Sequence, residues 1–146
     1  MTTTGLDVFD RTVQETNLWL KSIEERLQLE DRHVAYIALR GVLHTLRDRI
    51  GAENAVHLGA QLPMLIRGLY YEGWRMGTQT KERHVGEFVD RIWADLRKAP
   101  AVDPEAAVRA VLDVMWDKLD PGESAKLIEL MPRELRALWP RLARVD

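Results

Sequence analysis

The chain has 146 residues, of which 46% are hydrophobic and 30% charged, with a net charge of −2 and no cysteine. This length predicts a single domain, and the composition excludes a disordered chain and a membrane-embedded one. The lack of cysteine excludes disulfides, thiolate metal sites and thiol nucleophiles. No apolar run approaches the ~20 residues that span a bilayer, and the first residues lack the features of a signal peptide. We therefore expect a cytoplasmic protein with no membrane partner.

Hydrophobic residues near the start of the chain recur at helical spacing. They predict a first helix, capped by Thr4 or Asp7 and running to about Leu27. Its buried stripe is expected to be Phe9, Val13, Leu20, Ile23 and Leu27. Trp19 lies off this stripe, so it requires either a second apolar contact or a partly exposed indole.

Three further helices are predicted before residue 72. The second runs from about Arg32 to Ile50, follows the acidic pair Glu30–Asp31, and ends at Gly51 in a left-handed conformation. The third covers about 53–61 and carries Val56 and Leu58. The fourth is opened by Pro63, because proline is tolerated in the first turn of a helix. Its apolar residues are Leu65, Ile66, Leu69 and Tyr70.

In the second half of the chain, the sequence predicts four more helices, which follow a loop over residues 72–80. Thr80 can cap a fifth helix that runs to about Leu96. The sixth begins at Asp103 and reaches Leu119. The seventh begins with Asp120, which with Glu123 has the spacing of a capping box, and the eighth is opened by Pro132 and closed by Pro140.

The two halves resemble each other when they are shifted by 69 residues, which places Pro63 on Pro132 (132 − 63 = 69). Without a gap, the same shift aligns Ala38 with Ala107, Arg40 with Arg109, Asp48 with Asp117, Arg67 with Arg136 and Leu69 with Leu138. Self-similarity at a fixed period is typical of repeat architectures. We therefore predict an all-α, single-domain helical bundle over residues 1–146, with about eight helices in two pseudo-repeated four-helix units, residues 5–72 and 81–140.

Several stretches of the sequence are similar to a known family. They are Thr4-Gly-Leu-Asp-Val-Phe-Asp-Arg-Thr-Val13, Val42-Leu-His-Thr-Leu-Arg-Asp-Arg49, Gln61-Leu-Pro-Met-Leu-Ile-Arg-Gly-Leu-Tyr-Tyr-Glu-Gly-Trp74 and Leu135-Arg-Ala-Leu-Trp-Pro140. They resemble the bacterial family catalogued as domain of unknown function 2267. The resemblance implies a fold and no reaction, so it carries over no catalytic or binding residues.

No enzyme-like motif is complete. Glu30 and His33 have the Glu-x-x-His spacing of di-iron bundles, but such a site needs this motif twice and two more carboxylates. His44 and Asp48 lie one helical turn apart without a third ligand. Serine elbows and glycine-rich phosphate loops are lacking as well. We predict no catalytic, metal-binding or cofactor-binding residue and no enzyme, although an active site assembled only by the fold stays an open alternative.

The aromatic cluster after Pro63 is the main candidate for a functional site. Tyr70 and Tyr71 point about 100° apart on a helix, so both are buried only if the following loop folds back, and Trp74 could supply that cover. The rings could simply seal the junction between the halves. Tyr, Trp and Arg are also the residues that most often anchor interfaces. The predicted partner-binding residues are Arg67, Tyr70, Tyr71, Trp74 and Arg75.

The sequence favours a protein-interaction or structural module, with a protein partner or self-association through this cluster. One alternative is a pocket between the halves for an apolar small molecule. A second is weak nucleic-acid association through the C-terminal arginines, which gather near Trp139. These are Arg133, Arg136, Arg141 and Arg144.

Overall fold

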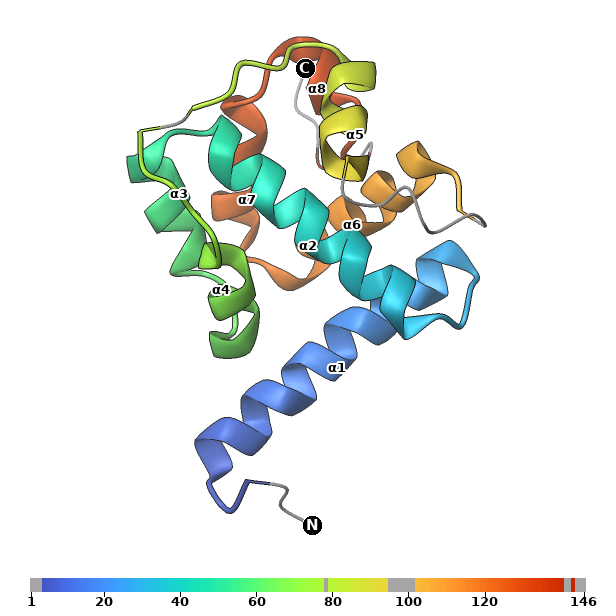
Figure 1. The fold of residues 1–146 in the computed structure, drawn as a ribbon, viewed down its shortest axis with the longest axis vertical. Helices are drawn as coiled ribbons and strands as arrows, with labels where there is room; N and C mark the ends of the chain where they lie inside the picture. Colours follow the sequence, from blue (N-terminus) through green and yellow to red (C-terminus); the bar gives the residue numbers. More distant parts are fainter. Residues whose placement is uncertain (1–3, 78, 95–101, 141–142, 144–146) are drawn as a thin grey trace.

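A computed structural model describes residues 4–77, 79–94, 102–140 and 143, and these form eight helices and no strand (Figure 1). The all-α prediction is therefore confirmed. The helices are α1 (Asp7–Leu27), α2 (Arg32–Arg49), α3 (Ala52–Gly59), α4 (Met64–Tyr71), α5 (Val85–Trp93), α6 (Pro104–Lys118), α7 (Pro121–Glu129) and α8 (Arg133–Arg136).

Helix α2 is the central element of the bundle. It packs against α1, α3, α4, α5 and α6, while α6 also contacts α1, α5 and α7. One continuous cluster of buried side chains draws on all eight helices. Its largest fully buried members include Ile23, Leu39, Leu43, Tyr70, Phe88, Leu112, Met115 and Trp139. The helices are therefore held by one shared core.

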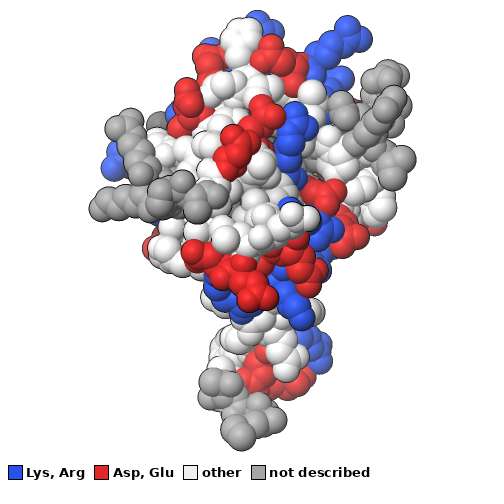
Figure 2. All heavy atoms as spheres, turned by 90° about the vertical axis from the view of Figure 1, so that its right-hand side faces the viewer, with Lys and Arg blue, Asp and Glu red and all other residues white. Residues whose placement is uncertain are grey.

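The first half of α1 projects from the body of the molecule in both views (Figures 1 and 2). We call residues 6–18 the arm. The predicted stripe of α1 is buried at Leu20 and Ile23, where the helix crosses the body, but Phe9 is 44% and Val13 37% exposed. The prediction of a buried Phe9 and Val13 is therefore wrong, because the body ends before the arm does. Trp19 is buried, so it has the second apolar contact that its position required.

Acidic side chains cap three of the helices. Asp31 accepts from Val34 N at 3.2 Å, and Asp103 accepts from Ala106 N at 3.0 Å. Asp120 accepts from Gly122 N at 3.2 Å. These starts agree with the sequence, since aspartate satisfies backbone donors that have no partner inside the helix. Helix α1 differs, because it begins at Asp7 after Leu6, which has no capping side chain.

Helix α5 begins later than predicted, at Val85 rather than after Thr80. The preceding segment is bound to the end of α2: Thr80 N donates to Asp48 O at 2.9 Å, and Arg49 Nε donates to Glu82 O at 2.9 Å. Backbone groups committed to α2 in this way are not available for a helix. Thr80 is therefore not a cap, and the predicted end of this helix near Leu96 lies outside the described residues.

Gly51 has a φ of +86°, so a positive φ, which glycine adopts readily, is present as predicted. Its ψ of 156° is extended, however, and Ile50 is the residue that ends α2. Gly51 instead precedes α3, and its carbonyl accepts from Ala55 N at 2.8 Å. The glycine reverses the chain between α2 and α3.

Aligned helices of the two halves begin at matching positions. α3 begins at 52 and α7 at 121 (121 − 52 = 69), and α4 begins at 64 and α8 at 133 (133 − 64 = 69). The aligned arginines also bind alike: Arg67 donates to Leu62 O, and Arg136 donates to Met131 O, each at 2.9 Å. These parallels agree with a duplicated chain, which stays a prediction.

Candidate functional site

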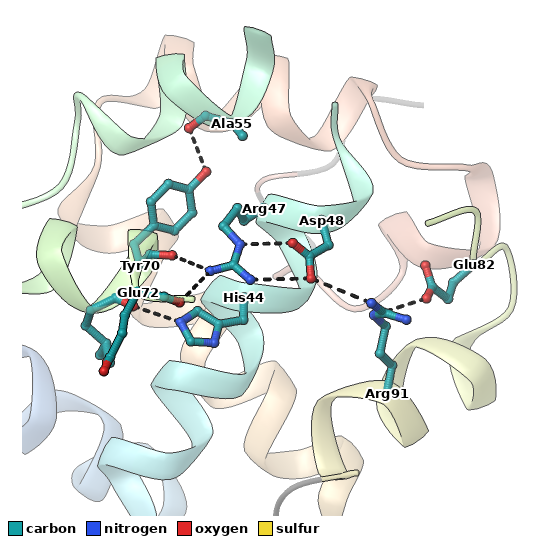
Figure 3. A network of polar contacts seen from close by, with 9 residues as sticks. His44, Arg47, Asp48, Ala55, Tyr70, Glu72, Glu82 and Arg91 are labelled. Carbon is teal, nitrogen blue, oxygen red and sulfur yellow. Dashed lines mark hydrogen bonds and ion pairs between the residues drawn. The ribbon is translucent and has the colours of Figure 1, made fainter. Parts of the chain in front are cut away.

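Tyr70 is fully buried and joins α4 to its neighbours. Its hydroxyl donates to Ala55 O in α3 at 2.6 Å, and its carbonyl accepts from Arg47 Nη1 in α2 at 2.9 Å (Figure 3). Burial raises the pKa of the Tyr70 phenol, so the hydroxyl stays a hydrogen-bond donor. With no exposed surface, Tyr70 cannot contact a partner, and its predicted partner-binding role is corrected to packing.

Tyr71 and Trp74 form the cover that the sequence suggested. Their rings stack with centroids 5.6 Å apart, and the Tyr71 ring meets the edge of Tyr70 at 5.0 Å. Both are partly buried against the core. Gly59 makes room for them, since a Cβ at Gly59 would lie 2.3 Å from the Tyr71 hydroxyl oxygen. The rings therefore seal α4 against α3, and an additional partner-binding role stays a prediction.

The two arginines among the predicted partner-binding residues, Arg67 and Arg75, differ in their surroundings. Arg67 Nε donates to Gly59 O and Nη2 to Leu62 O, each at 2.9 Å. These carbonyls lie at and after the end of α3, where the last carbonyls of a helix have no intrahelical partner. Arg67 therefore caps α3, while Arg75 is exposed.

Arg47 is the centre of a polar network that the sequence analysis missed (Figure 3). Its side chain is only 6% exposed, and it pairs with Asp48 through Nε and Oδ1 at 2.9 Å. Its Nη1 also donates to the carbonyls of Tyr70 and Glu72, at 2.9 and 3.0 Å. A buried arginine with a carboxylate and two carbonyls is satisfied rather than free to bind a ligand.

The network continues to the segment before α5. Arg91 lies 3.6 Å from Asp48 Oδ2 through Nη2, and 3.4 Å from Glu82 Oε1 through Nε. Asp48 therefore connects α2 with α5, as Figure 3 shows. Basic and acidic side chains alternate along this series of contacts. Each partly buried charged group therefore has a neighbour of opposite charge.

His44 belongs to the same face of α2. Its Nε2 lies 2.7 Å from Leu69 O, and since a carbonyl only accepts, Nε2 carries the hydrogen. Burial is the main cause that lowers the pKa of His44, and Arg47 and Arg40 lower it further, against the opposing hydrogen bond to Leu69. The imidazole is therefore held neutral and links α2 to α4.

These residues line a polar groove of about 630 Å³ between α2 and α5. Its walls include His44, Arg47, Asp48 and Arg91. The contacts above already use the charged atoms of Arg47, Asp48 and Arg91. The groove is therefore best explained by its internal ion pairs and hydrogen bonds.

A second groove, of about 580 Å³, is mainly apolar and lies between α1, α2 and α4. We call it the apolar groove. Its lining residues are Phe9, Thr12, Thr16, Leu20, Tyr36, Leu39, Met64, Leu65, Ile66, Gly68, Leu69 and Glu72. Phe9 is 44% exposed, and Met64 and Leu65 are each 48% exposed, so large hydrophobic side chains meet water here. Of these residues, Phe9 was expected in the buried stripe of the first helix.

The charged side chains do not form a patch of one sign on the face seen in Figure 2, where acidic and basic groups intermix. Of the C-terminal arginines, Arg136 donates to Met131 O at 2.9 Å and Glu129 O at 3.1 Å, while Arg133 is exposed. Arg141 and Arg144 lie outside the described residues. Of the two described arginines, only Arg133 is exposed, which is weak support for nucleic-acid binding.

The described residues contain no group of three or more His, Cys, Asp and Glu side chains suited to a metal ion. The ring centroids of His33 and Tyr36 are 6.3 Å apart, and the imidazole of His44 is hydrogen-bonded to the carbonyl of Leu69. The described helices include none that is long and apolar enough to cross a membrane.

Together these features define a small all-α protein with a sealed aromatic junction, an internal polar network and an apolar groove. Residues 16–138 match the model of the family described as "Uncharacterized conserved protein (DUF2267)", so the chain belongs to this family and the resemblance found in the sequence is confirmed. A comparison with curated proteins finds no match. The matched range includes α2 and α4 but starts after Phe9 and Thr12.

Proposed function

We propose that the protein is a non-enzymatic interaction module that docks an amphipathic helix in the apolar groove. The observation that carries this proposal is a mismatch between pattern and burial. Phe9 belongs to the stripe predicted to be buried and Leu65 to the apolar residues of the fourth predicted helix, yet both are about half exposed and line the same groove. Such side chains favour a partner that covers them.

The shape and chemistry of the groove suit a helix. An apolar groove between helices accepts the apolar face of an amphipathic helix, whose anchors recur at i, i+3, i+4 and i+7. Here α1 and α4 form the walls, and Leu39 and Leu69 contribute apolar lining. The walls carry few charges, since Glu72 is the only ionisable carboxylate among the lining residues.

Gly68 leaves space for a partner on the exposed side of α4. It is exposed, and a Cβ built on it meets no atom within 4 Å. A glycine inside a helix costs roughly 1 kcal/mol relative to alanine, so its position in the groove is not explained by helix stability. Small residues let two helix backbones approach closely.

The proposal is tested with a labelled synthetic peptide that forms a neutral amphipathic helix with leucines at the four anchor spacings. Fluorescence anisotropy should show that the wild type binds it. Gly68→Glu should weaken binding by at least about tenfold, or about 1.4 kcal/mol, because a charge then occupies the groove. The matched control is Gly86→Glu, since Gly86 in α5 is also exposed with no atom within 4 Å. Equal affinity of all three proteins would contradict the proposal.

A second candidate is a small apolar ligand in the same groove, in place of the predicted pocket between the halves. The observation that favours it is a volume of about 580 Å³ with mainly apolar lining, which lies in the range of small-molecule sites. Long-chain fatty acids should then raise the thermal midpoint of the wild type and not that of Gly68→Glu. Bacterial origin and a cytoplasmic location remain expectations from the sequence and its family resemblance.

A further inference from the structure

We infer that the helix docked in the apolar groove is the arm of a second copy of this chain. This inference rests on the proposed function, because it names the partner of the same groove. The chain carries both halves of a helix-in-groove contact. The groove lies between α1 and α4, and the arm is a preformed helix that projects beyond the body (Figure 1).

The arm has the anchor pattern that the groove requires. Phe9 and Val13 are spaced i and i+4, so they lie on one side of the helix, and Leu6 precedes its first turn as the N-cap residue. Leu6, Phe9 and Val13 are 54%, 44% and 37% exposed. Within the described part of the chain, each of these side chains keeps more than a third of its surface exposed, although Phe9 also lines the groove of its own chain. The exposed surface is available to a neighbouring molecule.

The charges of the arm do not oppose the pairing of two identical copies. At about 100° per residue, Asp7 and Arg11 each lie about 160° around the helix from Phe9, which is nearly the opposite side. They form an ion pair of 2.9 Å with highly exposed side chains. The Asp10 carboxylate, at the flank, accepts from Thr4 N at 2.9 Å. The stripe that enters the groove is therefore uncharged.

A two-fold axis doubles the contact. In an isologous dimer each arm enters the groove of the other copy, so every apolar patch is used twice. Five side chains are between 37% and 54% exposed, namely Leu6, Phe9, Val13, Met64 and Leu65. They would remove about 450 Å² of side-chain surface per copy, or about 900 Å² in the pair, which is the range of weak and transient complexes. The dimer should therefore dissociate on dilution.

Sedimentation-velocity ultracentrifugation over a dilution series tests the inference on the full chain. The wild type should change from dimer to monomer as it is diluted. Gly68→Glu should weaken the dimer by at least about tenfold, and Gly86→Glu should behave as the wild type. A second variant, Met64→Glu, guards against misfolding, since an acidic residue in the first turn of α4 suits the helix dipole. Circular dichroism and the thermal midpoint establish that each variant is folded.

The outcomes separate the two proposals. A wild type that stays monomeric throughout the series but binds the amphipathic peptide overturns the second-copy inference and leaves the proposed function standing. A dimer that Gly68→Glu and Met64→Glu leave intact also overturns the inference, because its interface lies elsewhere. If these variants change neither dimer formation nor peptide binding, both proposals fail.

Discussion

The hydroxyl of Thr12 accepts a hydrogen bond from the backbone N–H of Leu65, 2.9 Å away, which ties the arm to the first turn of α4. The first amides of a helix have no intrahelical acceptor, and Pro63, which precedes α4, offers no capping side chain. A residue of another helix therefore provides the cap. This bond sets the distance between the two walls of the apolar groove.

Replacing Thr12 with valine should lower the free energy of unfolding by about 1 kcal/mol, the usual effect of losing a helix cap. Valine keeps the shape of threonine but lacks the acceptor oxygen. Urea denaturation measures the change, and Thr12→Ser is the control because serine retains the oxygen. Equal stability of Thr12→Val and the wild type would show that the bond contributes nothing to the fold.

Replacing Arg47 with methionine should lower the free energy of unfolding by about 2–4 kcal/mol. The loss leaves the Asp48 carboxylate and the carbonyls of Tyr70 and Glu72 without the partner that they share. Arg11→Met serves as the control, since Arg11 pairs only at the exposed surface of the arm and such pairs contribute little. A similar small effect for both variants would contradict a structural role of the network.

Alanine should have opposite effects at two helical glycines. At Gly68, where space is open, it should raise stability by up to about 1 kcal/mol. At Gly59 it should lower stability, because the new Cβ would meet the Tyr71 hydroxyl oxygen at 2.3 Å and displace the ring from Trp74. Thermal unfolding compares the two variants, and a gain at Gly59 would refute the packing described for Tyr71.

The unfolding free energy should depend on pH through His44. Burial lowers the pKa of His44 in the folded protein below 6.5, so the unfolded chain takes up this proton first as the pH falls. The stability due to the neutral imidazole is therefore present above about pH 6.5 and is lost as the pH falls through the folded-state pKa. Urea denaturation above and below pH 6.5 measures how far the free energy of unfolding falls with pH. This fall should be smaller for His44→Gln than for the wild type. An equal fall in both proteins would contradict a buried, neutral His44.

Helix identity and most helix starts were predictable from the sequence, because local chemistry determines them. Asp31 and Asp103 cap where their positions suggested, and Trp74 covers Tyr71 as the geometry of a helix end required. The late start of α5 was not predictable. It follows from hydrogen bonds between the segment around Thr80 and the end of α2, which are contacts between distant parts of the chain.

The candidate site was predicted less well than the fold. Spacing identifies which side of a helix is apolar, but it does not show where the body of the protein ends, so Phe9 and Val13 were assigned to the core. Tyr70 was listed among the partner-binding residues beside the alternative that the rings seal the junction, because a sequence does not reveal which of the rings is buried. Arg47 stands among the buried residues of α2, and an arginine at an apolar position of a helix was the signal that could have identified the network.

Cross-linking of single-cysteine variants tests the contact between arm and groove most directly, because the natural chain contains no cysteine. Chains with Val13→Cys and chains with Met64→Cys are mixed under mild oxidation, and mass spectrometry identifies each disulfide-linked pair. We expect a mixed dimer of the two variants to form faster than a dimer between Val13→Cys and Val56→Cys, a control in α3 whose residue is 50% exposed. Equal rates for the two mixtures would contradict docking of the arm in the apolar groove of a second copy.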